Sequence, residues 1–320
     1  MPKNLSRPPK VIVILGPTAS GKSELAVKIA KKFNGEIISA DSRQIYRGLD
    51  ICSGKVPRDS IFRKSDFQYK DVGRPYIYKG VVHHLLDVAL PKKIFTVAQY
   101  QKLAEKALKD ILRRGKIPII CGGTGFYIDA LIYNYKLPKV PPQKKLRKQL
   151  EKKSTEELFK QLKKLDPERY ETIDKKNKRR IIRAIEIAKT LGKVPTLQQI
   201  QGKKSSYDFL KIGIKLPKET LKTRINRRVD KMLKLGLINE TKQLLKKYPA
   251  DLPVFNTIGY REIIDYLKGK TTLPEAISLI KKNTYQYAKR QMTWFKKNKE
   301  IYWIKNKGEA FRLLRGYLTD

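Results

Sequence analysis

A glycine-rich segment near the start of the sequence places the strongest constraint on the fold. It lies between an apolar run at 11–15 and a helix-forming stretch at 24–32. Its residues are Gly16, Pro17, Thr18, Ala19, Ser20, Gly21, Lys22 and Ser23. The glycines let backbone N–H groups curl around an anion, the lysine neutralises outer phosphate oxygens, and the final hydroxyl can hold Mg²⁺. The segment predicts a phosphate-binding loop, but it does not specify the phosphate ester or the group that is transferred.

The charge balance indicates a polyanionic partner. The 320 residues include 72 Lys and Arg against 30 Asp and Glu, a formal net charge of +42. Nucleic acid is the leading candidate for such a partner. A lysine-rich surface can also reflect genome composition or a heat-adapted host, so charge alone does not establish RNA binding.

Cysteine content and the amino-terminal sequence favour a cytoplasmic protein. Cys52 and Cys121 are far apart and form no CxxC pair, which supports neither a disulfide framework nor a zinc site. We expect both to be small buried side chains. The apolar run at 11–15 is too short for a signal-peptide core or a membrane span.

The order of apolar runs predicts a P-loop NTPase-like α/β fold. Strand-like runs at 11–15, 36–39, 117–121 and 209–214 alternate with helical patterns, which is typical of a parallel sheet flanked by helices. From 138 to 205 the sequence is rich in Lys and Glu and shows helical periodicity. We therefore expect a catalytic core at 1–137 and 206–320, with an all-helical insertion at 138–205.

Two helices are expected in the insertion. Ser154 and Glu157 form a capping-box pattern before one of them. The other, at 177–191, groups Arg179, Arg180 and Arg183 beside an apolar stripe. This face could bind a phosphate backbone, and a solvated cationic surface explains it equally well.

Polar residues follow other strands of the expected sheet. Asp41 comes directly after the run at 37–40, where a carboxylate could bind Mg²⁺ through water or accept a proton. Capping a helix together with Ser42 is its structural alternative. The turn Gly122-Gly123-Thr124-Gly125 follows the strand at 117–121, and it is either a ligand-approach turn or a plain tight turn.

Other candidates are less specific. Asp87 competes with Asp41 for a Walker-B-like role. The adjacent histidines at 83 and 84 point to opposite faces of an extended segment, which argues against a metal site. Arg224, Arg227 and Arg228 either supply cations to a departing diphosphate or are solvated.

Several motifs together resemble the bacterial-type tRNA isopentenyltransferases, the IPP transferase family. Besides the phosphate loop they are SADSRQIYRGLDI from Ser39, HHLLD from His83, GGTGFY from Gly122, RRIIRAIE from Arg179, LKTRINRRVDKMLKLGL from Leu221, TIGYRE from Thr257 and YAKRQMTWF from Tyr287. They occur in the family's order between about residues 11 and 295. Their joint occurrence is far more specific than the phosphate loop alone.

The resemblance implies transfer of a dimethylallyl group from dimethylallyl diphosphate to N6 of adenosine 37 in tRNAs reading codons that begin with U. The loop at 16–23 would grip the donor's diphosphate, Ser23 would contact Mg²⁺, and Arg224 would be a further cation. Asp41 would accept a hydrogen bond from N6 and act as the base. A carboxylate suits this role because an adenine amine is a poor nucleophile until its proton is drawn off.

By the same resemblance, tRNA would be bound at the anticodon stem-loop, with the target base unstacked into the site. The implied tRNA contacts are Asp41, Ser42, Arg43, Gln44, Thr124, Arg179, Arg180, Ile181, Ile182, Arg183, Thr257, Ile258, Gly259, Tyr260, Arg261 and Glu262. We expect a monomer without a membrane partner. Ser23 replaces the threonine of many members, a mild change, and the stretch at 58–79 looks longer than usual.

Three other functions remain open at this point. A P-loop small-molecule kinase would use ATP in the same loop, but it has no need of a basic insertion. An isopentenyltransferase acting on free adenine nucleotides would not need the arginines at 179–183. A nucleotide-switched RNA-binding protein would explain charge and loop, but not an acidic residue beside the loop.

Overall fold

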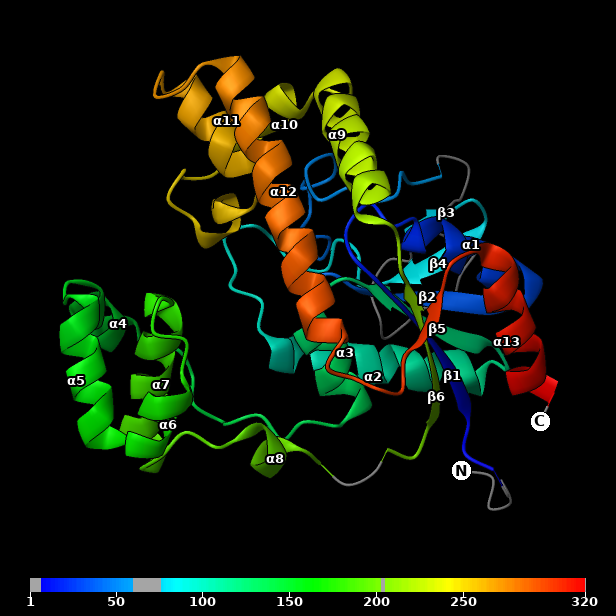
Figure 1. Ribbon diagram of the computed structural model, residues 1–320, viewed down its shortest axis with the longest axis horizontal. Helices are drawn as coiled ribbons and strands as arrows, with labels where there is room; N and C mark the ends of the chain where they lie inside the picture. Colours follow the sequence, from blue (N-terminus) through cyan, green and yellow to red (C-terminus); the bar gives the residue numbers. More distant parts are fainter. Residues whose placement is uncertain (1–6, 60–75, 203–204, 320) are drawn as a thin grey trace. The chain divides into compact units, whose positions relative to one another are not determined.

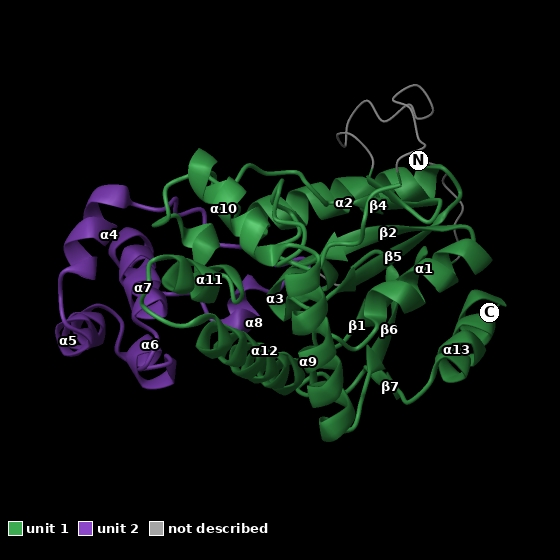
Figure 2. Cartoon of the chain, turned by 90° about the horizontal axis from the view of Figure 1, so that it is seen from above, with its two compact units in different colours: residues 1–132, 205–320 green, residues 133–204 purple. Residues whose placement is uncertain are grey.

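The computed structural model describes residues 7–59, 76–202 and 205–319. The chain divides into two compact units, one formed by 1–132 with 205–320 and the other by 133–204 (Figure 2). The second unit covers most of the stretch expected as a helical insertion. Part of the 58–79 stretch, residues 60–75, lies outside the described residues.

The first unit is built on a seven-stranded sheet with the order β3-β4-β2-β5-β1-β6-β7 (Figure 1). Its strands are β1 Lys10–Leu15, β2 Gly35–Ala40, β3 Tyr76–Tyr78, β4 Val81–His84, β5 Ile117–Gly122, β6 Asp208–Ile214 and β7 Tyr302–Ile304. Every pairing is parallel except that of β3 with β4. The four strands expected from the sequence are the four at the centre, so the predicted α/β class is confirmed.

The register brings three strand ends to one edge of the sheet. Leu15 at the end of β1 pairs with Gly122 at the end of β5, and Gly122 also pairs with Ala40 at the end of β2. The phosphate loop, Asp41 and the second glycine-rich turn each follow one of these ends. They therefore emerge side by side, as parallel strands dictate.

Eight α-helices and a short 3-10 helix are described in the first unit. They are α1 Lys22–Lys32, α2 Val97–Arg113, α3 Gly125–Ile132, α9 Lys218–Lys234, α10 Leu237–Lys247, η2 Pro253–Asn256, α11 Tyr260–Leu267, α12 Leu273–Phe295 and α13 Lys307–Thr319. Helices α1 and α13 share an apolar cluster with β1, β5 and β6. A second cluster joins the loop after β2 to α9, α10, α11 and α12. This second cluster builds the wall that faces the sheet edge.

Helices are the only regular secondary structure among the described residues of the second unit. Its helices are α4 Lys144–Glu151, α5 Thr155–Leu165, α6 Pro167–Thr172, α7 Lys178–Leu191 and α8 Leu197–Ile200. The capping box of Ser154 and Glu157 is present, as predicted. Leu158, Leu162 and Ile185 belong to an apolar core within this unit.

The two cysteines were expected to be buried. Cys52 and Cys121 are both free and buried, as predicted. Within the described ranges, no helix has the length and apolar character needed to cross a membrane.

Candidate active site

A cavity of about 320 Å³ opens at the carboxyl edge of the sheet in the first unit. Its walls come from the phosphate loop, the loop after β2, the end of β5, α9, the segment 256–259 and α12. Lys22, Ser23 and Asp41 are among the lining residues. A basic side chain, a hydroxyl and a carboxylate thus line the same cavity.

The phosphate loop closes onto the start of α1. Gly21 holds the N-cap position with a φ of 90°, a conformation that glycine adopts at little cost. The Lys22 ammonium donates to the Pro17 carbonyl oxygen at 3.2 Å. Burial lowers the pKa of Lys22, while Cys121 and Asp41 act in the opposite direction. The backbone N–H groups at the helix start and the lysine make a site for an anion.

Gln291 of α12 braces both glycine-rich turns. Its amide oxygen accepts from the Thr18 N–H at 2.8 Å, and its amide nitrogen donates to the Gly123 carbonyl at 2.8 Å. A Cβ on Gly123 would lie 2.2 Å from that nitrogen, so a larger residue there would displace the Gln291 amide from this position. The sequence alone does not single out Gln291, because its role depends on contacts between distant segments.

Asp41 is held in a defined orientation. Its Oδ1 accepts from the Arg43 N–H at 2.9 Å. The Thr124 hydroxyl oxygen accepts from the Ser42 N–H at 3.0 Å, and the Thr124 N–H donates to the Ala40 carbonyl at 3.1 Å. Thr124 therefore fixes the chain on both sides of Asp41, a role that the glycine-rich turn alone did not reveal.

Two arginines one helical turn apart on α9 flank the loop. The Arg224 guanidinium donates to the Ser20 carbonyl at 3.2 Å, beside the loop. Arg228 lines the cavity and donates to the Ser53 carbonyl at 3.3 Å. Burial lowers the pKa of Arg228, and Asp41 opposes that shift. Arg228 was one of three equivalent arginines in the sequence, and only its tertiary position singles it out.

Some residues of the segment 257–262 line the cavity, and others hold the segment in place. Thr257, Ile258 and Gly259 line the cavity together with Ser42, Arg43 and Gln44. Tyr260 is fully buried, and its hydroxyl donates to Glu240 at 2.6 Å. Glu262 is buried and accepts from the Gly259 N–H at 2.7 Å. Tyr260 and Glu262 therefore hold the turn in place, whereas Arg261 is exposed.

The arginine-rich segment of α7 is divided in the same way. Ile181 and Ile182 are buried in the core of the second unit, so their side chains stabilise the helix. Arg183 donates to Glu186 and to the Val140 carbonyl. Arg179 and Arg180 are exposed, and Arg180 lies 3.6 Å from Asp174. Of the tRNA contacts predicted on this helix, Arg179 and Arg180 are therefore the two with exposed positive charge.

Asp87 and the two histidines have structural partners. Asp87 pairs with Lys55 at 2.5 Å and is absent from the cavity lining, which favours Asp41 as the carboxylate of the site. His84 pairs with buried Glu36 at 2.7 Å, and His83 contacts the Val81 carbonyl at 3.0 Å.

A phosphate loop beside a carboxylate and a buried arginine, at the carboxyl edge of a parallel sheet, defines an α/β P-loop protein with a candidate phosphate-ester site. The family model for IPP transferase matches residues 44–298. The chain belongs to the IPP transferase family, and the resemblance found in the sequence is confirmed.

Known proteins similar to this chain extend over nearly its whole length. A tRNA dimethylallyltransferase of Anoxybacillus flavithermus is 42% identical over 297 residues, covering 92% of this chain and 90% of the relative. A solved tRNA delta(2)-isopentenylpyrophosphate transferase of Staphylococcus epidermidis is 37% identical with a TM-score of 0.68, covering 97% and 99% of the two chains. A eukaryotic dimethylallyltransferase solved acting on tRNA is 30% identical with a TM-score of 0.73, covering 93% of this chain and 74% of that one.

Proposed function

We propose that this protein transfers the dimethylallyl group of dimethylallyl diphosphate to N6 of adenosine 37 in tRNAs that read codons beginning with U. The observation that carries the proposal is the single cavity lined by Lys22, Ser23 and Asp41. Lys22 and Ser23 suit a diphosphate, and the Asp41 carboxylate suits the role of the catalytic base that accepts a proton. The names of the relatives, tRNA dimethylallyltransferases, support the same reaction.

The donor's diphosphate binds the backbone N–H groups where the loop at 16–23 enters α1, together with Lys22. Arg224 beside the loop and Arg228 in the cavity add positive charge. The bond between the allylic carbon and the diphosphate oxygen breaks, and its electron pair leaves with diphosphate. Fixed cations favour this step because they lie where negative charge develops.

Asp41 receives the proton of the acceptor. The N6 lone pair forms the new carbon–nitrogen bond, and N6 then carries a proton that the Asp41 carboxylate accepts. The hydrogen bond from Arg43 and the support from Thr124 restrict how this carboxylate can turn. The target adenine must leave its stack to reach a cavity of this kind.

The oxygen ligands of the cavity fit Mg²⁺. Ser23 and Asp41 offer a hydroxyl and a carboxylate, and Mg²⁺ characteristically combines one or two such ligands with water and substrate phosphates. When bound, Mg²⁺ would neutralise charge on the diphosphate. Ser23 would be its direct protein ligand.

The second unit supplies much of the charge for the anticodon stem-loop. Residues 133–204 contain 22 Lys and Arg against 8 Asp and Glu, so less than a quarter of the chain carries one third of the net charge. Arg179, Arg180 and Arg261 are the exposed cationic contacts from the predicted set. We also propose that the protein acts as a monomer in the cytoplasm.

Mass spectrometry of nucleosides from unmodified tRNA, incubated with the protein, Mg²⁺ and dimethylallyl diphosphate, tests this function. With the wild-type protein we expect N6-dimethylallyladenosine at position 37. With Asp41→Asn the rate of prenyl transfer should fall about 100-fold or more. Asp251→Asn, at an exposed position, is the matched control and should keep full activity. Prenylation of AMP in place of tRNA would assign the enzyme to the free-nucleotide class, and ATP-dependent phosphorylation of a small acceptor would make it a kinase.

A further inference from the structure

Glu240 of α10 lies outside the cavity lining, yet it is bound to two segments that form the cavity wall. Its Oε2 accepts from the N–H groups of Asp50 and Ile51, at 3.0 and 2.7 Å. Its Oε1 accepts from the Cys52 N–H at 3.1 Å and from the Tyr260 hydroxyl at 2.6 Å. Two carboxylate oxygens thus receive four hydrogen bonds, which uses their full acceptor capacity.

The two segments joined by Glu240 touch each other closely. The Cys52 thiol donates to the Ile258 carbonyl at 3.1 Å. Gly259 has a φ of 103°, and a Cβ there would lie 2.5 Å from the Cys52 sulfur. A shift of either segment would therefore move the other, and both line the cavity.

The position of the first segment also determines where Arg228 lies. The Ser53 carbonyl accepts from Arg228 at 3.3 Å and from the Gln44 side chain at 3.4 Å. A Cβ on Gly54 would lie 1.9 Å from the Arg228 guanidinium. Both Arg228 and Gln44 line the cavity, so their placement depends on residues 53 and 54.

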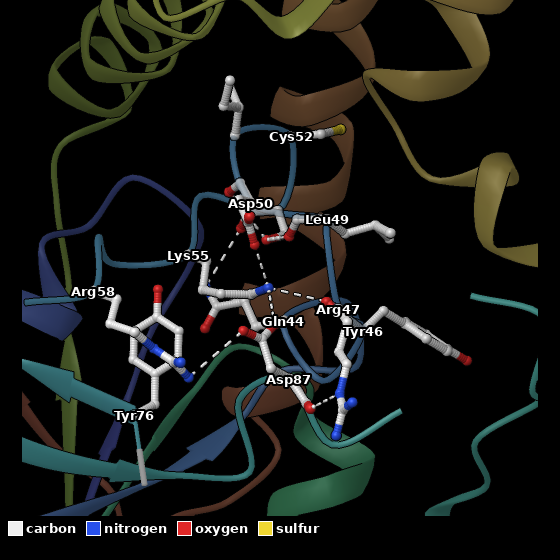
Figure 3. Close-up of polar contacts among 12 residues, drawn as sticks. Gln44, Tyr46, Arg47, Leu49, Asp50, Cys52, Lys55, Arg58, Tyr76 and Asp87 are labelled. Atoms are coloured by element: carbon white, nitrogen blue, oxygen red, sulfur yellow. Dashed lines mark hydrogen bonds and ion pairs between the residues drawn. The ribbon is translucent and has the colours of Figure 1, made fainter. Parts of the chain in front are cut away.

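Lys55 closes the same loop from the inside (Figure 3). Its ammonium donates to the Tyr46 carbonyl at 2.9 Å and to Asp50 and Asp87 at 2.5 Å each. The Lys55 side chain is only 1% exposed. The loop from 44 to 55 is therefore a braced unit, and Glu240 fixes this unit against the segment 257–260.

We propose that Glu240 is a positioning residue that sets the distance between the two wall segments, 52–54 and 257–259, and so shapes the cavity for the tRNA base. This inference rests on the proposed function. None of the four described hydrogen bonds of Glu240 is to the phosphate loop, so its effect on the acceptor side should exceed the effect that reaches the diphosphate through Arg228.

The test compares Glu240→Gln with Glu219→Gln, an exposed acidic residue on α9 that serves as the matched control. Glutamine keeps the size of glutamate but replaces one acceptor oxygen by a donor, which then opposes N–H or O–H groups. We expect kcat/KM for tRNA to fall about tenfold or more, because buried donors lose their acceptor. The dissociation constant of inorganic diphosphate with Mg²⁺ should rise by less, at most about threefold, because the phosphate loop keeps its contacts and only Arg228 can shift.

Equal kinetics in both variants would overturn the inference. So would a parallel loss of tRNA turnover and diphosphate affinity, since that pattern marks general destabilisation. Tyr260→Phe removes only one of the four donors and should lower kcat/KM for tRNA in the same direction by a smaller factor. If Glu240→Gln does not fold, unchanged tRNA kinetics in Tyr260→Phe would overturn the inference.

Hydrogen exchange distinguishes failure of this inference from failure of the proposed function, since it needs no substrate. The backbone amides of residues 50–52 should exchange faster in Glu240→Gln than in the wild-type protein. In Glu219→Gln their exchange rates should be unchanged. Unchanged exchange in both variants would remove the physical basis of the inference even if the protein prenylates tRNA.

Discussion

His83 couples folding to pH at the scale of a single residue. Burial lowers the pKa of His83 from 6.5 to about 4. Between these values the unfolded chain binds a proton that the folded chain excludes, so the free energy of unfolding falls as the pH drops from about 6.5 to 4. At pH 5 the loss should be about 2 kcal/mol relative to pH 7.5, given 1.4 kcal/mol per pH unit.

Urea unfolding of the unmodified protein and of His83→Gln at pH 7.5 and 5 measures this contribution. The variant should lose about 2 kcal/mol less on acidification. Asp129 titrates in the opposite sense, because burial raises its pKa to about 6 and its protonated form favours folding. That contribution is common to both proteins and cancels in the comparison. Equal acid losses in the two proteins would show that His83 is not responsible.

Single residues were predictable from the sequence where a motif fixes the local backbone. Lys22 and Asp41 follow strands at one sheet edge, and the structure brings them to one cavity. Arg228, Gln291 and Glu240 could not be singled out, because their contacts join segments far apart in the sequence. Burial likewise separates supporting residues from lining residues inside a motif, as at Tyr260 beside Gly259.

At the scale of elements, the arginines of helix α7 fall into two groups, one that pairs with a buried carboxylate and one that is exposed. Arg183 donates to Glu186, a fully buried carboxylate that Arg147 also binds at 2.6 Å. Arg179 and Arg180 are exposed. Replacing the exposed pair by glutamine should therefore affect RNA binding, whereas replacing Arg183 should affect folding.

Filter binding of tRNA and thermal unfolding separate the two effects. We expect Arg179→Gln with Arg180→Gln to weaken tRNA binding about tenfold and to leave the unfolding temperature unchanged within about 2 °C. Arg183→Gln should lower the free energy of unfolding by about 1–3 kcal/mol, because it weakens the pairing of a buried carboxylate. A double variant that binds tRNA normally would exclude α7 from the interface.

Elements at the centre of the fold were predictable, and those at the edges were not. Strands β1, β2, β5 and β6 are mainly apolar because both faces of a parallel sheet are covered. Strands β3 and β7 have three residues each, too few for a pattern to emerge. Helices α5 and α7 were predictable because each has apolar residues at helical spacing, and the capping-box residue Ser154 precedes α5.

At the scale of the whole molecule, the net charge of +42 predicts a strongly salt-dependent affinity for tRNA. Each phosphate contact releases counterions, so six contacts give a slope near −5 when log K is plotted against log salt. Between 50 and 200 mM KCl, tRNA binding should weaken about 1,000-fold. Fluorescence anisotropy with labelled tRNA measures this slope. If the contacts are confined to the anticodon stem-loop, an isolated stem-loop RNA of about 17 nucleotides should show most of the same slope. A tRNA slope shallower than about −2 would mean that most of the positive surface makes no contact with RNA.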